Sequence, residues 1–162
     1  MAIATMSWML AIPLLGLATG LRSMTPMAVL CWFAYLGYLP VEGSWASWTA
    51  RVTSVAVFTV LAVVELIADK LPRTPNRIAP VPLLVRLVLG GLAGSIAATG
   101  MNGPGLEGVL LGLIGAALGA FAGFMIRRDI VESVGCPDWP VALAEDLLAI
   151  LSSVFAMHVI SS

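Results

Sequence analysis

The chain has 162 residues, of which 60% are hydrophobic and only 10% charged, and its mean hydropathy is +1.02. This composition is typical of a protein that folds in lipid, and it excludes an ordinary soluble domain. Eight basic and nine acidic residues give a net charge of -1, which excludes an electrostatic case for binding nucleic acid.

Six apolar stretches follow one another and cover 111 of the 162 residues. A helix needs roughly 20 apolar residues to cross the hydrocarbon core. Near-continuous apolar runs favour helices over barrel strands, in which lipid-facing and lumen-facing residues alternate. The sequence therefore predicts one all-helical integral membrane domain over residues 1–162, a polytopic transmembrane bundle of about six spans. The predicted spans are residues 3–21, 24–39, 52–70, 82–99, 108–126 and 141–160.

The first two spans meet at Gly20-Leu21-Arg22-Ser23-Met24-Thr25-Pro26, with no hydrophilic loop between them. The first stretch lacks the basic segment and cleavage pattern of a signal peptide, so we expect it to remain as a span. Thr25 followed by Pro26 is typical of an N-cap and first helical position, which predicts a second helix from Pro26 to Leu39. Fourteen residues reach only about 21 Å, whereas the core is roughly 30 Å thick. Either the bilayer thins there or the turn is sunk below the headgroups.

A sunken turn would bring together Arg22, the hydroxyl groups of Ser23 and Thr25, and the free N–H groups of a helix N-terminus. This is the chemistry that binds an anionic group. The alternative is that Arg22 snorkels to phosphates of the inner leaflet. The sequence leaves both interpretations open.

The connector at residues 71–81 carries three prolines among basic residues and divides the predicted spans into two sets of three. An odd number of spans in each half would make the halves inverted relative to each other, as in many transporters. Gly16-Leu17-Ala18 resembles Gly91-Leu92-Ala93, which gives thin support to a 3+3 inverted repeat.

The basic residues are distributed unevenly between the two ends of the predicted bundle. One end receives only Arg51, and the other receives the remaining seven: Arg22, Lys70, Arg73, Arg77, Arg86, Arg127 and Arg128. Basic residues favour the cytoplasmic side. We therefore expect a multi-pass protein of the bacterial inner membrane with both termini outside.

The fifth span has glycines at spacings of four, three, four and four residues, which places them along one helical stripe: Gly108, Gly112, Gly115, Gly119 and Gly123. Gly90, Gly91 and Gly94 in the fourth span make a matching face. Small residues at this spacing let two backbones approach closely, within or between protomers, and a glycine-lined conduit is the alternative. Because six short helices enclose little volume, we expect a homo-oligomer joined through glycine faces, with a dimer favoured.

Ionisable residues recur at one depth near the predicted cytoplasmic end, where Glu65, Arg86 and Glu145 lie roughly 6 to 8 Å inside the spans. Four basic and four acidic side chains balance there: Arg22, Lys70, Arg77 and Arg86 against Glu65, Asp69, Glu145 and Asp146. An ionised residue at a span centre costs about 2.5 to 3.5 kcal/mol on insertion scales, so such groups normally face a partner or water. This layer is either a site for a solute or an ion-pair clasp between spans.

Enzymatic sites are not indicated. His158, Cys31 and Cys136 are too far apart in the predicted topology for the usual zinc sets or for a disulfide bond. Neither a Ser-His-Asp set nor a phosphate-binding loop can be assembled. We therefore expect no enzymatic activity, no cofactor and no metal site.

Three segments carry a resemblance to a known family: Gly20 to Pro26, Glu65-Leu66-Ile67-Ala68-Asp69-Lys70-Leu71-Pro72, and Arg73-Thr74-Pro75-Asn76-Arg77-Ile78-Ala79-Pro80 leading into Arg86 and Gly90. With Ala144-Glu145-Asp146 they resemble a group of small bacterial membrane proteins, domain of unknown function 4126. The resemblance implies a compact all-helical membrane domain. It implies no established activity, substrate or catalytic residue.

The function that we expect is a small inner-membrane transporter or channel for an ion or small polar solute. The expected binding or gating residues are Arg22, Ser23, Thr25, Glu65, Asp69, Arg86, Glu145 and Asp146. One alternative is a structural or assembly protein whose clasp holds the bundle closed. Another is a protein that binds a lipid headgroup through Arg22 and Arg86.

Overall fold

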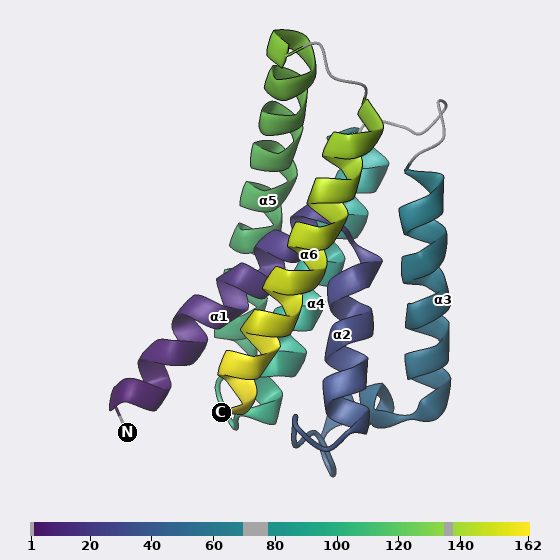
Figure 1. Ribbon diagram of the computed structural model, residues 1–162. Coiled ribbons are helices and arrows are strands. Elements are labelled where there is room, and N and C mark those ends of the chain that lie inside the picture. Colours follow the sequence, from purple (N-terminus) through teal and green to yellow (C-terminus); the bar gives the residue numbers. More distant parts are fainter. Residues whose placement is uncertain (1, 70–77, 135–137) are drawn as a thin grey trace.

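A computed structural model of the chain describes residues 2–69, 78–134 and 138–162, and every regular element in these ranges is helical. The elements are α1 (Ala2–Leu21), α2 (Met24–Tyr35), the 3-10 helix η1 (Trp45–Ala50), α3 (Val52–Ala68), α4 (Pro80–Gly100), α5 (Gly105–Val134) and α6 (Asp138–Ser161). Figure 1 shows one bundle in which α1 crosses obliquely and α3 stands at the edge beside α2.

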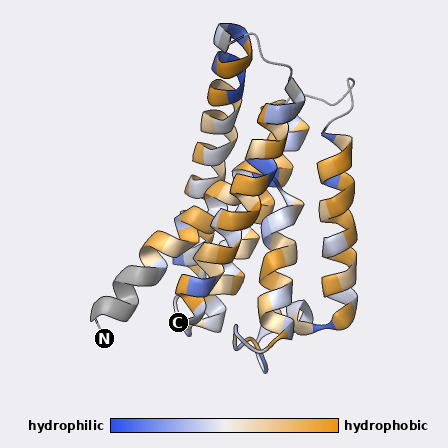
Figure 2. Cartoon of the chain, viewed as in Figure 1, coloured by the Kyte–Doolittle hydropathy of each residue, from blue (hydrophilic) through white to orange (hydrophobic). Residues whose placement is uncertain are grey.

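Three helical segments within the described residues are long and apolar enough to cross a membrane: Pro80–Gly100, Gly105–Ser133 and Trp139–Ser161. The apolar segments Trp8–Leu21, Met24–Tyr35 and Val52–Ala68 are shorter. Figure 2 shows hydrophobic residues recurring along the helices. These apolar helices indicate a membrane protein. Three segments meet the length criterion rather than six, so the predicted six spans and the inverted repeat stay predictions.

Two helix ends differ from the predicted span boundaries by four residues or more. α2 ends at Tyr35, four residues before Leu39, because Gly37 adopts a φ of +80° that favours glycine. The N–H groups of Gly37 and Tyr38 donate to the carbonyls of Ala34 and Phe33, the hydrogen-bond pattern of a Schellman cap.

At the other boundary, α5 continues eight residues past Ile126 to Val134. The apolar run stops at Ile126, but Arg127 and Arg128 are good helix formers and extend the helix. Figure 1 shows this end of α5 extending beyond the neighbouring helices. Arg127 therefore lies on a helix, although the sequence placed it in a connector.

The glycine stripe of α5 packs against α4 on one side. A Cβ atom at Gly112 would overlap the carbonyl oxygen of Gly90, and a Cβ atom at Gly108 would overlap that of Gly94. The two backbones therefore touch directly, as small residues at this spacing allow.

The same stripe also packs against α1, a contact that the sequence did not predict. A Cβ atom at Gly16 would lie 2.5 Å from the carbonyl oxygen of Gly112. Added Cβ atoms at Gly115 and Gly119 would overlap carbonyl oxygens of α1. Gly123 is also buried. The described α5 glycines therefore pack against α1 and α4 of the same chain. The homo-oligomer joined through glycine faces stays a prediction.

Candidate functional site: a charged layer at a helix break

α1 and α2 are separated by a break at Arg22 and Ser23, and this break lies inside the bundle. Arg22 is 0% exposed and Ser23 is 8% exposed. Figure 1 shows the junction well short of the ends of α5 and α6. A break leaves the last carbonyls of one helix and the first N–H groups of the next without partners in the helix. Away from water, these groups need partners from the protein.

Glu65 of α3 supplies the partners for the start of α2. Its Oε1 accepts hydrogen bonds from the N–H group of Ser23 at 2.8 Å and from the Ser23 hydroxyl at 2.5 Å. Its Oε2 accepts one from the N–H group of Met24 at 2.8 Å. A carboxylate at a helix N-terminus also has the favourable sign for the helix dipole.

This contact corrects the predicted N-cap. α2 begins at Met24 rather than Pro26, and Thr25 lies within its first turn, 4% exposed. Ser23 makes no side-chain cap of its own. Because a carboxylate 42 positions away in sequence binds the first N–H groups, the helix begins earlier than a local cap at Thr25 would allow.

Arg86 of α4 supplies the partner for the end of α1. Its Nη1 donates to the carbonyl oxygens of Gly20 and Leu21, each at 2.7 Å. The side chain is buried, with 5% of its surface exposed. A guanidinium at a helix C-terminus satisfies unpaired carbonyls and complements the negative end of the dipole. Each helix end at the break is therefore bound by a charge opposite to its own partial charge. Glu65 binds the start of α2, and Arg86 binds the end of α1.

Arg22 lies between two carboxylates from different helices. Its Nη1 forms an ion pair with Asp69, which directly follows α3. Its Nη2 lies 2.5 Å from Oδ1 of Asp146 on α6. Because the Arg22 side chain is fully buried among these groups, it does not snorkel to lipid phosphates in this conformation.

Arg127 of α5 also joins the layer, and sequence reasoning missed it. Its Nη1 lies 3.4 Å from Oε2 of Glu145 and 3.9 Å from Oδ2 of Asp69. Arg127 follows Gly123 by four residues, so it continues the buried glycine stripe. That spacing was the signal that could have placed it in the layer.

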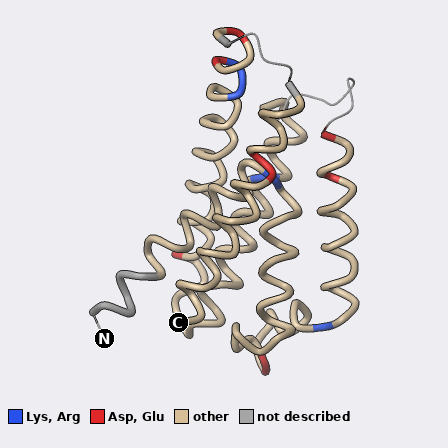
Figure 3. Tube along the Cα trace, in the orientation of Figure 1, with Lys and Arg blue, Asp and Glu red and all other residues tan. Residues whose placement is uncertain are grey.

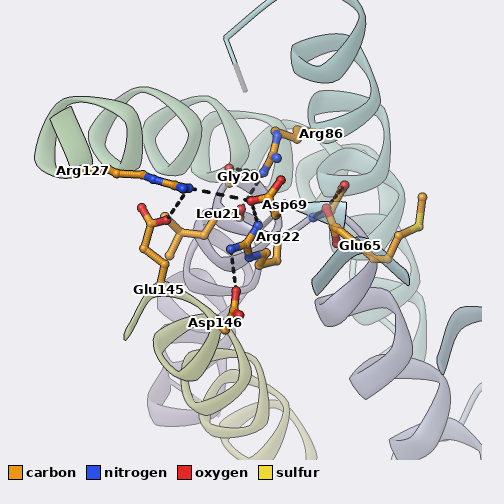
Figure 4. Close-up of polar contacts among 11 residues, drawn as sticks. Gly20, Leu21, Arg22, Glu65, Asp69, Arg86, Arg127, Glu145 and Asp146 are labelled. Atoms are coloured by element: carbon orange, nitrogen blue, oxygen red, sulfur yellow. Dashed lines mark hydrogen bonds and ion pairs between the residues drawn. The ribbon is translucent and has the colours of Figure 1, made fainter. Parts of the chain in front are cut away.

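Seven ionisable side chains thus lie at one level of the bundle. Figure 4 shows five of them turned toward one another, while Arg86 and Glu65 lie beside them and bind the backbone on the two sides of the helix break. The seven are Arg22, Glu65, Asp69, Arg86, Arg127, Glu145 and Asp146, and each has an ion pair or hydrogen bond. Figure 3 shows charged residues gathered toward the end of the bundle at which α3 and α5 end. Thr25 does not join these contacts, and its hydroxyl has no hydrogen-bond partner among the described residues. The predicted Lys70 and Arg77 lie outside the described residues.

Chemically, two guanidinium groups and three carboxylates of the layer form linked ion pairs: Arg22, Arg127, Asp69, Glu145 and Asp146. Asp69 is within ion-pair distance of both Arg22 and Arg127. Such an arrangement can exchange ion-pair partners without leaving a cation alone.

Comparison with known proteins gives one match. The model of the family described as Domain of unknown function (DUF4126) matches residues 9–159. No curated protein and no solved structure matches the chain.

Proposed function

We propose that this chain, which belongs to the DUF4126 family, is a small transporter or channel that moves an ion or small polar solute across the inner membrane. The charged layer is its gate, and the conformation described here is the closed one. The basic end faces the cytoplasm, because Lys and Arg favour that side. Both termini then lie outside, and the working unit is a homo-oligomer.

The observation that carries this proposal is the liganded helix break. In many transporters a span is discontinuous, and its helix ends bind the solute and the coupling ion. Here Glu65 occupies the N-terminal end of α2, and Arg86 occupies the C-terminal end of α1. Glu65 thus occupies a position that suits an anion, and Arg86 occupies one that suits a cation.

The energetics of buried charge also favour a functional layer. A buried ion pair is weak support for stability, because well-packed apolar residues of similar volume often hold a fold equally well or better. Ionisable residues inside membrane helices are expensive and commonly mark solute or proton pathways. Seven of them at one level exceed what a simple clasp needs.

Partner exchange is the mechanism that the geometry favours. A solute or proton that weakens the contact between Arg22 and Asp69 leaves Arg22 with Asp146. Asp69 retains Arg127 nearby. Because both groups keep a partner, the pair can separate without a bare buried charge, and the two halves of the bundle can rock.

The competing proposal is a structural or assembly protein in which the same layer is a permanent clasp. The observation in its favour is that all seven ionised side chains already have partners within the chain. A permanent clasp requires that these pairs stay closed in the working protein.

Flux in reconstituted vesicles separates the two proposals. Purified protein is placed in liposomes, and trapped dyes report proton, potassium and chloride movement while vesicle swelling reports glycerol and urea. We expect flux of at least one probe above that of empty vesicles. We expect its loss in Glu65→Gln and Arg22→Ala, because a gate that cannot close again cannot complete a cycle of alternating access.

Exposed charges provide matched controls. Glu107 and Arg128 lie outside the layer, so Glu107→Gln and Arg128→Gln should keep the flux of the unaltered protein. Normal assembly is checked by size-exclusion chromatography in detergent. If properly assembled Glu65→Gln and Arg22→Ala both keep full flux, the gate is refuted, and if no probe moves, the clasp is favoured.

A further inference from the structure

α3 is the least buried of the helices that contribute to the charged layer. Only Val55 and Ala62 of its 17 residues are buried, whereas nine of the 21 residues of α4 are. Its main neighbours are α2 and η1, and Figure 1 shows it at the edge of the bundle. Most of its apolar surface therefore faces outward.

The contact between α3 and α2 is incomplete. An open groove of about 380 Å³ runs along the outer surface where the first half of α3 meets α2, and it is lined by Trp32, Tyr35, Val52, Val55, Ala56, Thr59 and Val60. The Trp32 indole N–H donates to the Thr59 hydroxyl at 3.1 Å across this region. In lipid, acyl chains solvate an apolar helix face as well as another helix does, so only close packing and polar contacts hold helices together. Apolar contact therefore holds α3 weakly.

Apart from the hydrogen bond between Trp32 and Thr59, the polar contacts of α3 among the described residues are concentrated at its two ends. At its start, Arg51 has an extended backbone between η1 and α3, and the Ser54 hydroxyl donates to the Trp48 carbonyl at 2.6 Å. At its far end, Glu65 binds the start of α2, and Asp69 binds Arg22. The ends thus differ in kind: one is a short bend and the other a set of ionic contacts.

Glu65 lies near the end of α3, and Asp69 directly follows the helix. Their spacing of four residues places both carboxylates on one face, so one movement of α3 engages or releases both. Their release leaves the other charges paired. Arg22 keeps Asp146, and Arg127 keeps Glu145, both on α6. Arg86 stays on the carbonyls that end α1.

We infer that α3 is the moving gate of this protein: it tilts about Arg51 and is latched in the closed position by Glu65 and Asp69. Opening uncovers Arg22 and the first N–H groups of α2. The use of this movement for transport rests on the proposed function, but the movement itself does not.

Spin-label distances test the movement directly. In a background with Cys31→Ala and Cys136→Ala, labels at Ile67 and Leu147 report the distance from the latched end of α3 to α6, since both positions are exposed. A helix of 17 residues is about 25 Å long, so a tilt of about 15° moves its far end by roughly 6 Å. We expect the double variant Glu65→Gln with Asp69→Asn to lengthen this distance by that amount.

Labels at Val52 and Phe155, also exposed, report the hinge end and should keep their distance. Glu107→Gln is the matched control, because it removes an exposed carboxylate outside the latch. Where the double variant does not assemble, each single variant should give a smaller change in the same direction. An unchanged distance from Ile67 to Leu147 in assembled latch variants overturns the inference.

The same samples separate this inference from the proposed function. If α3 moves but no probe crosses the vesicles, the gate stands and the transport proposal fails. If flux is present and α3 does not move, transport stands and the gate helix is wrongly assigned.

Discussion

The contact of α5 with α1 and α4 differs in kind from the contact of α3 with the rest of the bundle. The first is backbone against backbone along the glycine stripe, where an added Cβ atom at Gly94 or Gly112 overlaps a carbonyl oxygen. The contact of α3 combines an open groove beside α2 with ionic contacts at the far end of the helix. In lipid, close packing makes a contact permanent, whereas charges that have alternative partners make one reversible.

The largest effect is expected where the glycine contact is broken. In Gly119→Val, the new Cβ atom overlaps the Leu17 carbonyl oxygen, and backbone atoms cannot move aside as a flexible side chain can. Overpacking typically costs about 1 to 3 kcal/mol and occasionally more. A whole valine side chain against a fixed backbone belongs beyond that range, because neither helix can move aside without losing its other close contacts. We expect a large loss of assembled protein and a much lower midpoint of thermal unfolding in detergent.

Ala122 on the same helix is exposed, so Ala122→Val places the same final side chain toward lipid and is the control. It should keep the yield and unfolding midpoint of the unaltered protein. If both valine variants behave alike, the tight contact of α5 with α1 is not what holds this helix in place.

The next largest effect is expected at the centre of the charged layer. Arg22→Met removes the cation from between Asp69 and Asp146 and leaves two carboxylates near each other in a buried site. Breaking a buried pair in this way costs about 3 to 5 kcal/mol. We expect a correspondingly lower unfolding midpoint.

A second substitution shows whether stranded charge is the cause. Asp146→Asn removes one of the two carboxylates, so the combination of Arg22→Met with Asp146→Asn should recover part of the loss. Strictly additive losses would contradict a direct coupling between these side chains.

The sequence predicted that these charged residues share one level of the bundle, but not which of them form ion pairs. Residue counts from the span ends suffice to place Glu65, Arg86 and Glu145 at one level, because the helical rise is constant. Which groups meet depends on the rotation and neighbours of each helix, and those arise from packing. The cap that Glu65 provides for α2 joins residues 42 positions apart, so no local motif predicts it.

The sequence also predicted glycine packing but only one of its two partners. Gly90 and Gly94 were proposed for the stripe because they share its spacing. Gly16 and Gly20 of α1 share it too, and both contact α5. The stripe was interpreted as one contact face, whereas α1 and α4 occupy adjacent sides of it.

The smallest predicted effect concerns Arg127 and Arg128, neighbours on α5 that differ in their surroundings. Arg127 is 17% exposed and faces Glu145 at 3.4 Å, whereas Arg128 is 52% exposed and contacts only its neighbour Asp129 among the ion pairs of the described residues. Arg127→Gln should lower stability by about 0.5 to 1 kcal/mol, because this pair is long and partly solvated. Arg128→Gln should change stability by less than about 0.5 kcal/mol, as surface substitutions usually do. Unfolding midpoints of the two variants in one detergent make the comparison, and equal values would place Arg127 outside the layer. Because Arg127 also lies 3.9 Å from Asp69 in the closed conformation, its loss should make release of the α3 latch easier, which the distance from Ile67 to Leu147 would register.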